Sequence, residues 1–237
     1  MEAFSRSVAL GYRWIETDLH LTSDGVPVCF HDPTLSRTTN GQGEIKDLAW
    51  GEVRELDAGY HHHPDRGFPF RAQGVRVPSL EEVAGAFPDL HMVLELKADH
   101  TEQPVLRLIR QMGLTDRVIV ASFSDARLAR LEKLSGGSVS TSAGEAEVAR
   151  LVKAAWLGRR AQSRHVALQI PARSGLVPLV TRRTVRAYHR MGLAVQVWTI
   201  NRPVQMESLL DRGVDGIMTD RPDLLREVFI KRGIWGP

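Results

Sequence analysis

Short apolar runs alternate with segments of helical periodicity along almost the whole chain. This alternation is typical of strands followed by crossover helices, and it predicts an α/β fold with a parallel sheet. Several such units within 237 residues favour a closed (β/α) barrel over an open sheet. We expect strands at residues 14–22, 26–31, 92–97, 118–122, 138–142, 165–170, 194–200 and 216–219. We expect helices at residues 80–87, 103–112, 125–134, 145–157, 181–191 and 204–212.

Turn and cap residues support these boundaries. Ser23-Asp24-Gly25 predicts a tight turn that breaks the first strand in two. Gly192 and Gly213 each follow a helical pattern and precede a strand, which is the expected position of a helix C-cap. Ser79 followed by Glu82 predicts a capping box at the start of a helix.

The chain is predicted to be a single domain over residues 1–237, with one insertion at about residues 34–76. A length of 237 residues with 43% hydrophobic content is sufficient for one sizeable core. The segment 34–76 is rich in Gly, Arg and His and has weak periodicity. We therefore expect an insertion over one end of the barrel, without a core of its own.

Charge, cysteine usage and hydropathy exclude several classes of protein. The net charge is only +3, and the strongest basic cluster, at residues 181–190, is interpreted as a solvated helix face rather than a nucleic-acid surface. The one cysteine, Cys29, excludes a disulfide within the chain and fits a reducing compartment. Neither a secretory signal nor a membrane-spanning run is visible, so we expect a cytoplasmic protein without bound nucleic acid.

Glu16 and Asp18 are the first candidate site residues. They lie two positions apart on a predicted strand, so both carboxylates point to the same face. Two carboxylates on one face repel each other unless a positive group lies between them, and Mg²⁺ or Ca²⁺ accepts such oxygens as ligands. The alternative is a polar edge strand with both acids in water, and this pair alone leaves the choice open.

Four further residues carry chemistry near predicted strand ends. His31 is suited to proton transfer near neutral pH, or it is a surface histidine in a turn. Glu95 and Lys97 share one face of a later strand, as a structural ion pair or as a cation ligand beside an anion-binding ammonium. Trp198 is either a core residue or an apolar wall for a ligand.

Several motifs occur together in a characteristic order. They are ETDLHLTSDGVPVCFHDPTLSRTTNGQG, VPSLEE, LELK, VQVWTIN and GVDGIMTDRPD. In this order and spacing the chain resembles the glycerophosphodiester phosphodiesterase family over essentially its whole length.

The resemblance implies a TIM (β/α)8-type barrel with its site at the carboxyl ends of the strands. It also implies an enzyme of lipid metabolism that hydrolyses a glycerophosphodiester to glycerol 3-phosphate and an alcohol. Glu16, Asp18 and Glu95 would hold a divalent metal, Mg²⁺ or Ca²⁺, and His31 would be one of two histidines acting as general acid and base. Lys97 would contact the phosphate, and Trp198 would pack against the glycerol or alcohol part.

The beginning of the chain departs from the family pattern. A first strand ending in His-Arg-Gly is missing, and with it the partner of His31 and a phosphate-binding arginine. We therefore expect a barrel lacking its first strand, impaired activity and a possible oligomer through the open edge. Two explanations remain, a truncated reading of a longer gene and a true short paralogue, and we favour the first. Two other functions also remain open: a non-catalytic metal- or phosphate-binding barrel, and hydrolysis of another phospholipid-derived diester.

Overall fold

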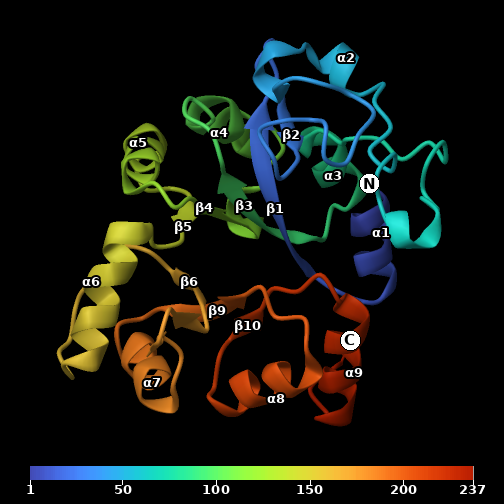
Figure 1. The fold of residues 1–237 in the computed structure, drawn as a ribbon. Coiled ribbons are helices and arrows are strands. Elements are labelled where there is room, and N and C mark those ends of the chain that lie inside the picture. The colour runs from blue at the N-terminus through green and yellow to red at the C-terminus, as the bar shows by residue number, and fades with distance from the viewer. Residues whose placement is uncertain (237) are drawn as a thin grey trace. The chain divides into compact units, whose positions relative to one another are not determined.

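The computed structural model describes residues 1–236, and the chain forms two compact units, whose larger helices and strands are labelled in Figure 1. The first unit comprises residues 1–120 and 129–139, and the second comprises residues 121–128 and those from 140 onward. The predicted strands and helices all occur, with ends within three residues of the expected positions. The prediction of an α/β fold with parallel strands is therefore confirmed.

The first unit is organised around β1 (Trp14–Leu21), which lies between β2 (Pro27–Cys29) and β3 (His91–Leu96). β3 is parallel to β1, and β4 (Val118–Ala121) follows β3 in the sheet order. β2 is antiparallel to β1 and pairs with residues 19–21 of that strand, after the predicted turn. This pairing brings the end of β2, Cys29, beside Leu19, so the chain then runs toward Asp18.

One face of this sheet forms the main core of the first unit. Ile15 and Leu19 of β1 are buried together with Met92, Leu94 and Leu96 of β3. Residues of α1 (Glu2–Ala9), α3 (Leu80–Ala86) and α4 (Glu102–Gln111) pack into the same cluster. Because side chains alternate along a strand, the opposite face carries Glu16, Asp18 and Glu95. Burial of the apolar face thus determines where the acidic residues point.

The insertion shares a small apolar cluster with the neighbouring part of the first unit. Leu35, Ile45 and Val53 of the insertion are buried together with Val28 of β2 and Val77. The segment includes only short helical turns: η1 (Ile45–Asp47), α2 (Trp50–Val53) and η2 (Pro64–Arg66). Its apolar residues are spaced irregularly, which explains why no periodicity was visible in the sequence.

The second unit is built on a parallel sheet in the order β10-β9-β6. A parallel bridge between Ser142 and Ala167 adds the segment of β5 beside β6. The strands are β5 (Ser140–Thr141), β6 (Ala167–Pro171), β9 (Ala194–Trp198) and β10 (Gly216–Ile217). The helices are α6 (Glu145–Trp156), α7 (Arg182–Arg190), α8 (Pro203–Asp211) and α9 (Pro222–Lys231).

Three smaller elements complete the described chain. α5 (Asp125–Ser135) extends from the second unit into the first, and η3 (Thr115–Arg117) precedes β4. A short hairpin of β7 (Arg173–Ser174) and β8 (Val177–Pro178) was not predicted, because two-residue strands have no measurable period. No helix within residues 1–236 is both long and apolar enough to span a bilayer.

Candidate active site

Three carboxylates converge on the polar face of the first unit's sheet. Asp18 of β1 lies directly opposite Glu95 of β3 in the parallel ladder, and Glu16 lies two residues before Asp18 on the same face. Each of the three side chains offers an oxygen within 4.8 Å of the other two. The structure therefore brings together the residues that the sequence predicts as metal ligands.

Lys97 lies between two of these carboxylates. Its Nζ is 3.0 Å from Oδ1 of Asp18 and 3.0 Å from Oε1 of Glu95. Burial raises the pKa of Glu95, although the hydrogen bond from Lys97 opposes this shift. Burial also acts to lower the pKa of Lys97, but its hydrogen bonds to Glu95 and Asp18 outweigh burial and raise the pKa overall. Lys97 is thus a charged counter-ion to the acidic group.

The group of three carboxylates fits a divalent cation. All three donors are carboxylate oxygens, which are the ligands that hard divalent cations take in proteins. One lysine leaves an excess of negative charge when all three acids are ionised, and a second positive species reduces their mutual repulsion. This donor set does not distinguish between hard cations such as Mg²⁺ and Ca²⁺.

His31 lies two residues after the end of β2. The backbone N–H of Phe30 donates to the carbonyl of Asp18 over 2.9 Å, which brings the following residue close to the acidic group. The side chain of His31 is 67% exposed, and its Nδ1 is 2.7 Å from Oδ1 of Asp32. Because Nδ1 is engaged in this way, Nε2 is the nitrogen that remains to exchange a proton with a ligand.

Asp32 and Arg37 hold His31, and the sequence reasoning assigned no role to either. Arg37 donates to both carboxylate oxygens of Asp32, through Nε to Oδ2 and through a terminal nitrogen to Oδ1 over 3.0 Å. These hydrogen bonds, with a smaller contribution from His31, lower the pKa of Asp32 to about 2 in spite of burial. The ionised Asp32 accepts the Nδ1–H of His31. The adjacency of His and Asp was a signal for this pair, whereas the loop conformation that brings in Arg37 was not visible in the sequence.

His20 supports the loop from within. It is buried, and its Nε2 lies 3.2 Å from the carbonyl oxygen of His31. Burial lowers the pKa of His20, so the imidazole is neutral at pH 7. In that state Nε2–H can donate to the carbonyl of His31 and fix the backbone there.

Trp198 belongs to the second unit, whereas the other five predicted site residues belong to the first. It is the last residue of β9, and its ring packs edge-to-face against Phe123 at a centroid distance of 5.8 Å. Phe123 is 52% exposed. The pair offers an apolar surface, and Phe123 was not predicted because a single aromatic residue in a loop carries no pattern.

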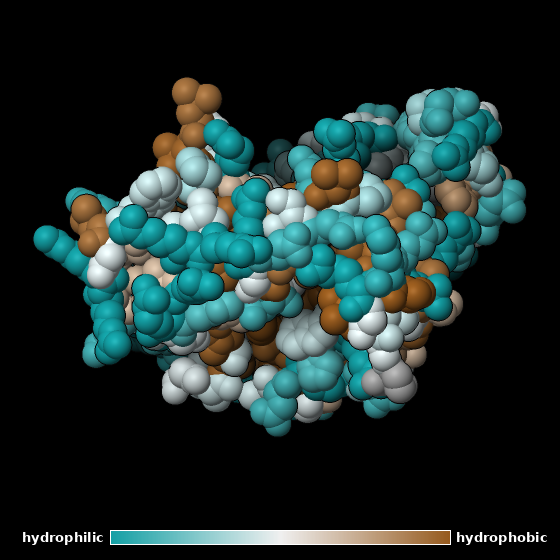
Figure 2. All heavy atoms as spheres, turned by 90° about the horizontal axis from the view of Figure 1, so that it is seen from below, coloured by the Kyte–Doolittle hydropathy of each residue, from teal (hydrophilic) through white to brown (hydrophobic). Residues whose placement is uncertain are grey.

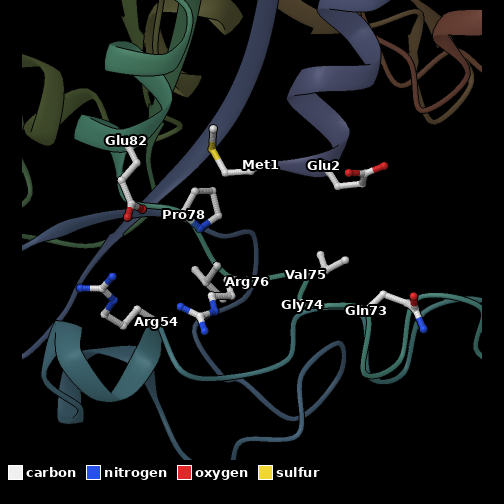
Figure 3. Close-up of a pocket in the computed structure, with 10 residues that line it drawn as sticks. Met1, Glu2, Arg54, Gln73, Gly74, Val75, Arg76, Pro78 and Glu82 are labelled. Carbon is white, nitrogen blue, oxygen red and sulfur yellow. The ribbon is translucent and has the colours of Figure 1, made fainter.

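A cavity of about 260 Å³ in the first unit does not include any predicted site residue. Arg54 and Arg76 line it, and Figure 3 shows Glu82 extending from α3 toward their side of the cavity. Both arginines lie within 4 Å of the carboxylate of Glu55, and Glu82 accepts the backbone N–H of Ser79. Arg54, Arg76 and Glu82 therefore already have partners within the protein.

The α/β fold thus brings three carboxylates, a lysine and a histidine held by an aspartate to one polar region of the first unit. The model of the glycerophosphoryl diester phosphodiesterase family matches residues 1–224, and the chain belongs to this family. The predictions of the family and of its enzyme class, glycerophosphodiester phosphodiesterase, are thereby confirmed.

Three similar proteins illustrate the relationship. A Mycobacterium tuberculosis protein named probable glycerophosphodiester phosphodiesterase 2 is 36% identical over 99% of this chain and 86% of its own length. The glycerophosphodiester phosphodiesterase of Caldanaerobacter subterraneus is 31% identical over 98% of this chain and 91% of its own. A solved structure of an Oleispira antarctica phosphodiesterase, in complex with the product sn-glycerol-3-phosphate, has a TM-score of 0.72 and 22% identity over 96% of this chain and 89% of that one. The solved neighbours are TIM-barrel enzymes, which confirms the predicted fold class.

Proposed function

We propose that this protein hydrolyses a glycerophosphodiester to glycerol 3-phosphate and an alcohol with a divalent cation, Mg²⁺ or Ca²⁺. The observation that carries the proposal is the convergence of Glu16, Asp18 and Glu95 within 4.8 Å, beside Lys97. The names of two relatives, matched over 86% and 91% of their own length, support the substrate class, and the glycerol 3-phosphate bound to the Oleispira antarctica phosphodiesterase supports the product.

Each residue receives a role that follows from its chemistry. Glu16, Asp18 and Glu95 would hold the cation, which supplies Lewis-acid polarisation of a phosphoryl oxygen when it is bound. Lys97 presents an ammonium that binds a phosphate oxygen and stabilises the negative charge that develops there. His31 exchanges a proton at Nε2, and Asp32 holds its ring by accepting the Nδ1–H. Trp198, supported by Phe123, packs against the glycerol or alcohol part.

The test is an assay of glycerophosphocholine hydrolysis that measures glycerol 3-phosphate with added Mg²⁺, with added Ca²⁺ and with chelator. We expect product only with a cation, and a loss of about 100-fold or more in Glu95→Gln, because one anionic ligand is lost. Glu81→Gln is the matched control, since Glu81 is exposed at the start of α3. Equal activity of the Glu95 variant and the wild type would contradict the proposal.

Two results would point to the other functions that the sequence leaves open. Cation binding by calorimetry, without turnover of any diester, would indicate a non-catalytic binding barrel. Turnover of another phospholipid-derived diester in place of glycerophosphocholine would retain the chemistry and change the substrate.

The proposal also includes a cellular location and an oligomeric state. A cytoplasmic location is tested by fractionation, and an oligomer formed through the edge of β1 is tested by light scattering. Within the described residues of the first unit, residues 14–17 of β1 have β3 as their only ladder partner. A monodisperse monomer would exclude the oligomer.

A further inference from the structure

Positive charge is concentrated in one part of the second unit. Between Glu147 and Glu207 the sequence contains eleven Lys and Arg residues and no Asp or Glu. The whole chain has 31 basic and 28 acidic residues, so the remainder has 20 and 28 and a net charge of −8. Packing of the hydrophobic core does not require that basic and acidic residues occupy different parts of the chain. The separation therefore concerns the charge of the protein surface.

Six arginines on two adjacent helical segments form what we call the α6–α7 basic surface. They follow the end of α6 or lie on α7, and the two helices are connected by a 3.2 Å hydrogen bond from Arg183 to the carbonyl of Trp156. All six are exposed, and none makes an ion pair within the described part of the chain. They are Arg159, Arg160, Arg182, Arg183, Arg186 and Arg190.

The position of two of these arginines is unfavourable for the helix itself. Arg182 and Arg183 occupy the first turn of α7, which has no acidic residue. Positive side chains are destabilising at a helix N-terminus because the macrodipole is positive there. Helix stability therefore does not explain these two cations, whereas an anionic partner would.

Two apolar side chains project at the same place. Trp156 is 43% exposed and Leu157 is 56% exposed, and Arg159 and Arg160 follow them after one glycine. The chain is fixed here, because the N–H of Gly158 donates to Ala155 and the N–H of Arg159 donates to Ala154. Figure 2 shows long hydrophilic side chains and separate apolar ones on the side of the view where Figure 1 places α6 and α7.

We propose that the α6–α7 basic surface binds the face of a membrane that contains anionic phospholipids. Lys and Arg near a bilayer surface are attracted to acidic headgroups, and Trp and Leu enter the boundary between headgroups and acyl chains. Nucleic acid would use the same arginines through its phosphates, but it would not require an exposed tryptophan and leucine between them. The inference does not depend on the proposed hydrolysis.

The experiment is co-sedimentation of the full chain with vesicles of phosphatidylcholine alone or with about 30% phosphatidylglycerol, an anionic lipid. We expect binding only to the anionic vesicles, weakened when salt rises from about 50 to about 500 mM because screening shortens the range of the attraction. The triple variant R160E/R182E/R186E should bind about 100-fold more weakly. Arg182→Glu complements the dipole of α7, so this substitution is compatible with the fold.

The control variant R13E/R66E/R107E makes the same change in net charge on exposed arginines of the first unit. It should bind anionic vesicles like the wild type. Trp156→Ser keeps every charge and should weaken vesicle binding several-fold, and brominated lipid should quench more of the total tryptophan fluorescence in the wild type than in this variant.

Three results would overturn the proposal. One is the absence of wild-type binding to anionic vesicles at low salt, a measurement that requires no variant. Another is equal binding by the two triple variants. The third is binding to double-stranded DNA at least as tight as to vesicles, with no effect of Trp156→Ser, which would identify a nucleic-acid surface.

Discussion

His31 depends on two neighbours for the position of its ring. Asp32 accepts from Nδ1 and is itself held by Arg37, so the three side chains form one short chain of charge-assisted hydrogen bonds. An Asp that orients a His and fixes its tautomer is an established arrangement for proton transfer. The proposal thus concerns a unit of three residues rather than one histidine.

This unit leads to a graded prediction for two substitutions. His31→Gln should lower kcat by about 10²- to 10⁴-fold, the usual contribution of a general acid or base. Asp32→Asn should lower kcat by less, about 10- to 100-fold, with little change in KM, because the ring remains but its tautomer and direction are no longer fixed. Steady-state kinetics on glycerophosphocholine measures both, and His189→Gln, which alters an exposed histidine of the second unit, is the control. A larger loss for Asp32→Asn than for His31→Gln would contradict the assigned roles.

Substitution of Lys97 tests whether its ammonium is a counter-ion whose role a bound cation can partly replace. In chelator, Lys97→Met should lower the free energy of unfolding by about 2 kcal/mol, because Asp18 and Glu95 then lose their partner in a partly buried site. Added Mg²⁺ or Ca²⁺ should restore part of the loss, since a cation can compensate the same carboxylates. Urea unfolding with and without cation measures the effect.

Lys46→Met is the matched control for that experiment. Lys46 pairs with Glu44 on an exposed surface, and such pairs contribute little to stability. The free energy of unfolding of the Lys46→Met variant should be almost the same as that of the wild type and should not depend on the cation. If the Lys97 variant behaved in the same way, the counter-ion role would be wrong.

At the scale of elements, the start of α3 was predictable in detail. The N–H of Glu82 donates to Oγ of Ser79, and the N–H of Ser79 donates to the carboxylate of Glu82, which is the capping box expected from the sequence. Ser79→Ala should therefore lower the free energy of unfolding by about 1 kcal/mol in urea denaturation. Ser5→Ala, an exposed position within α1, should change it by less than about 0.5 kcal/mol.

The sequence predicted elements well where one local rule decided the structure. The period of β1 and β3 and the spacing of Glu16, Asp18, Glu95 and Lys97 depend on alternation along a strand, which can be read from residue order. The apolar cluster of the insertion depends on packing between residues far apart in the chain, such as Leu35 and Val77. Loop conformation likewise brings Arg37 to Asp32 and Phe123 to Trp198, and the periodicity of the sequence does not reveal such loop contacts.

At the scale of the whole molecule, the two units raise the question of whether they unfold together. Each contains a buried group that resists ionisation. Burial raises the pKa of Cys29 in the first unit to about 12 and that of Tyr188 in the second unit to about 12. The hydroxyl of Tyr188 donates to the carbonyl of Leu179 over 3.1 Å. These groups serve as separate reporters of the two units.

Both groups should make the protein less stable in alkali. An unfolded thiol ionises near pH 8.5 and an unfolded phenol near pH 10, so between these values and pH 12 the folded state binds more protons than the unfolded state. The free energy of unfolding should therefore fall as pH rises above about 9, by up to about 1.4 kcal/mol per pH unit for each group that has titrated. Cys29→Ala should remove the part that begins near pH 9, and Tyr188→Phe the part that begins near pH 10. If the units unfold cooperatively, both substitutions will weaken the pH dependence of the same urea transition between pH 8 and pH 11. If the units unfold independently, each substitution will weaken the pH dependence of a different urea transition. A wild-type stability that does not change with pH in this range would contradict the burial of both groups.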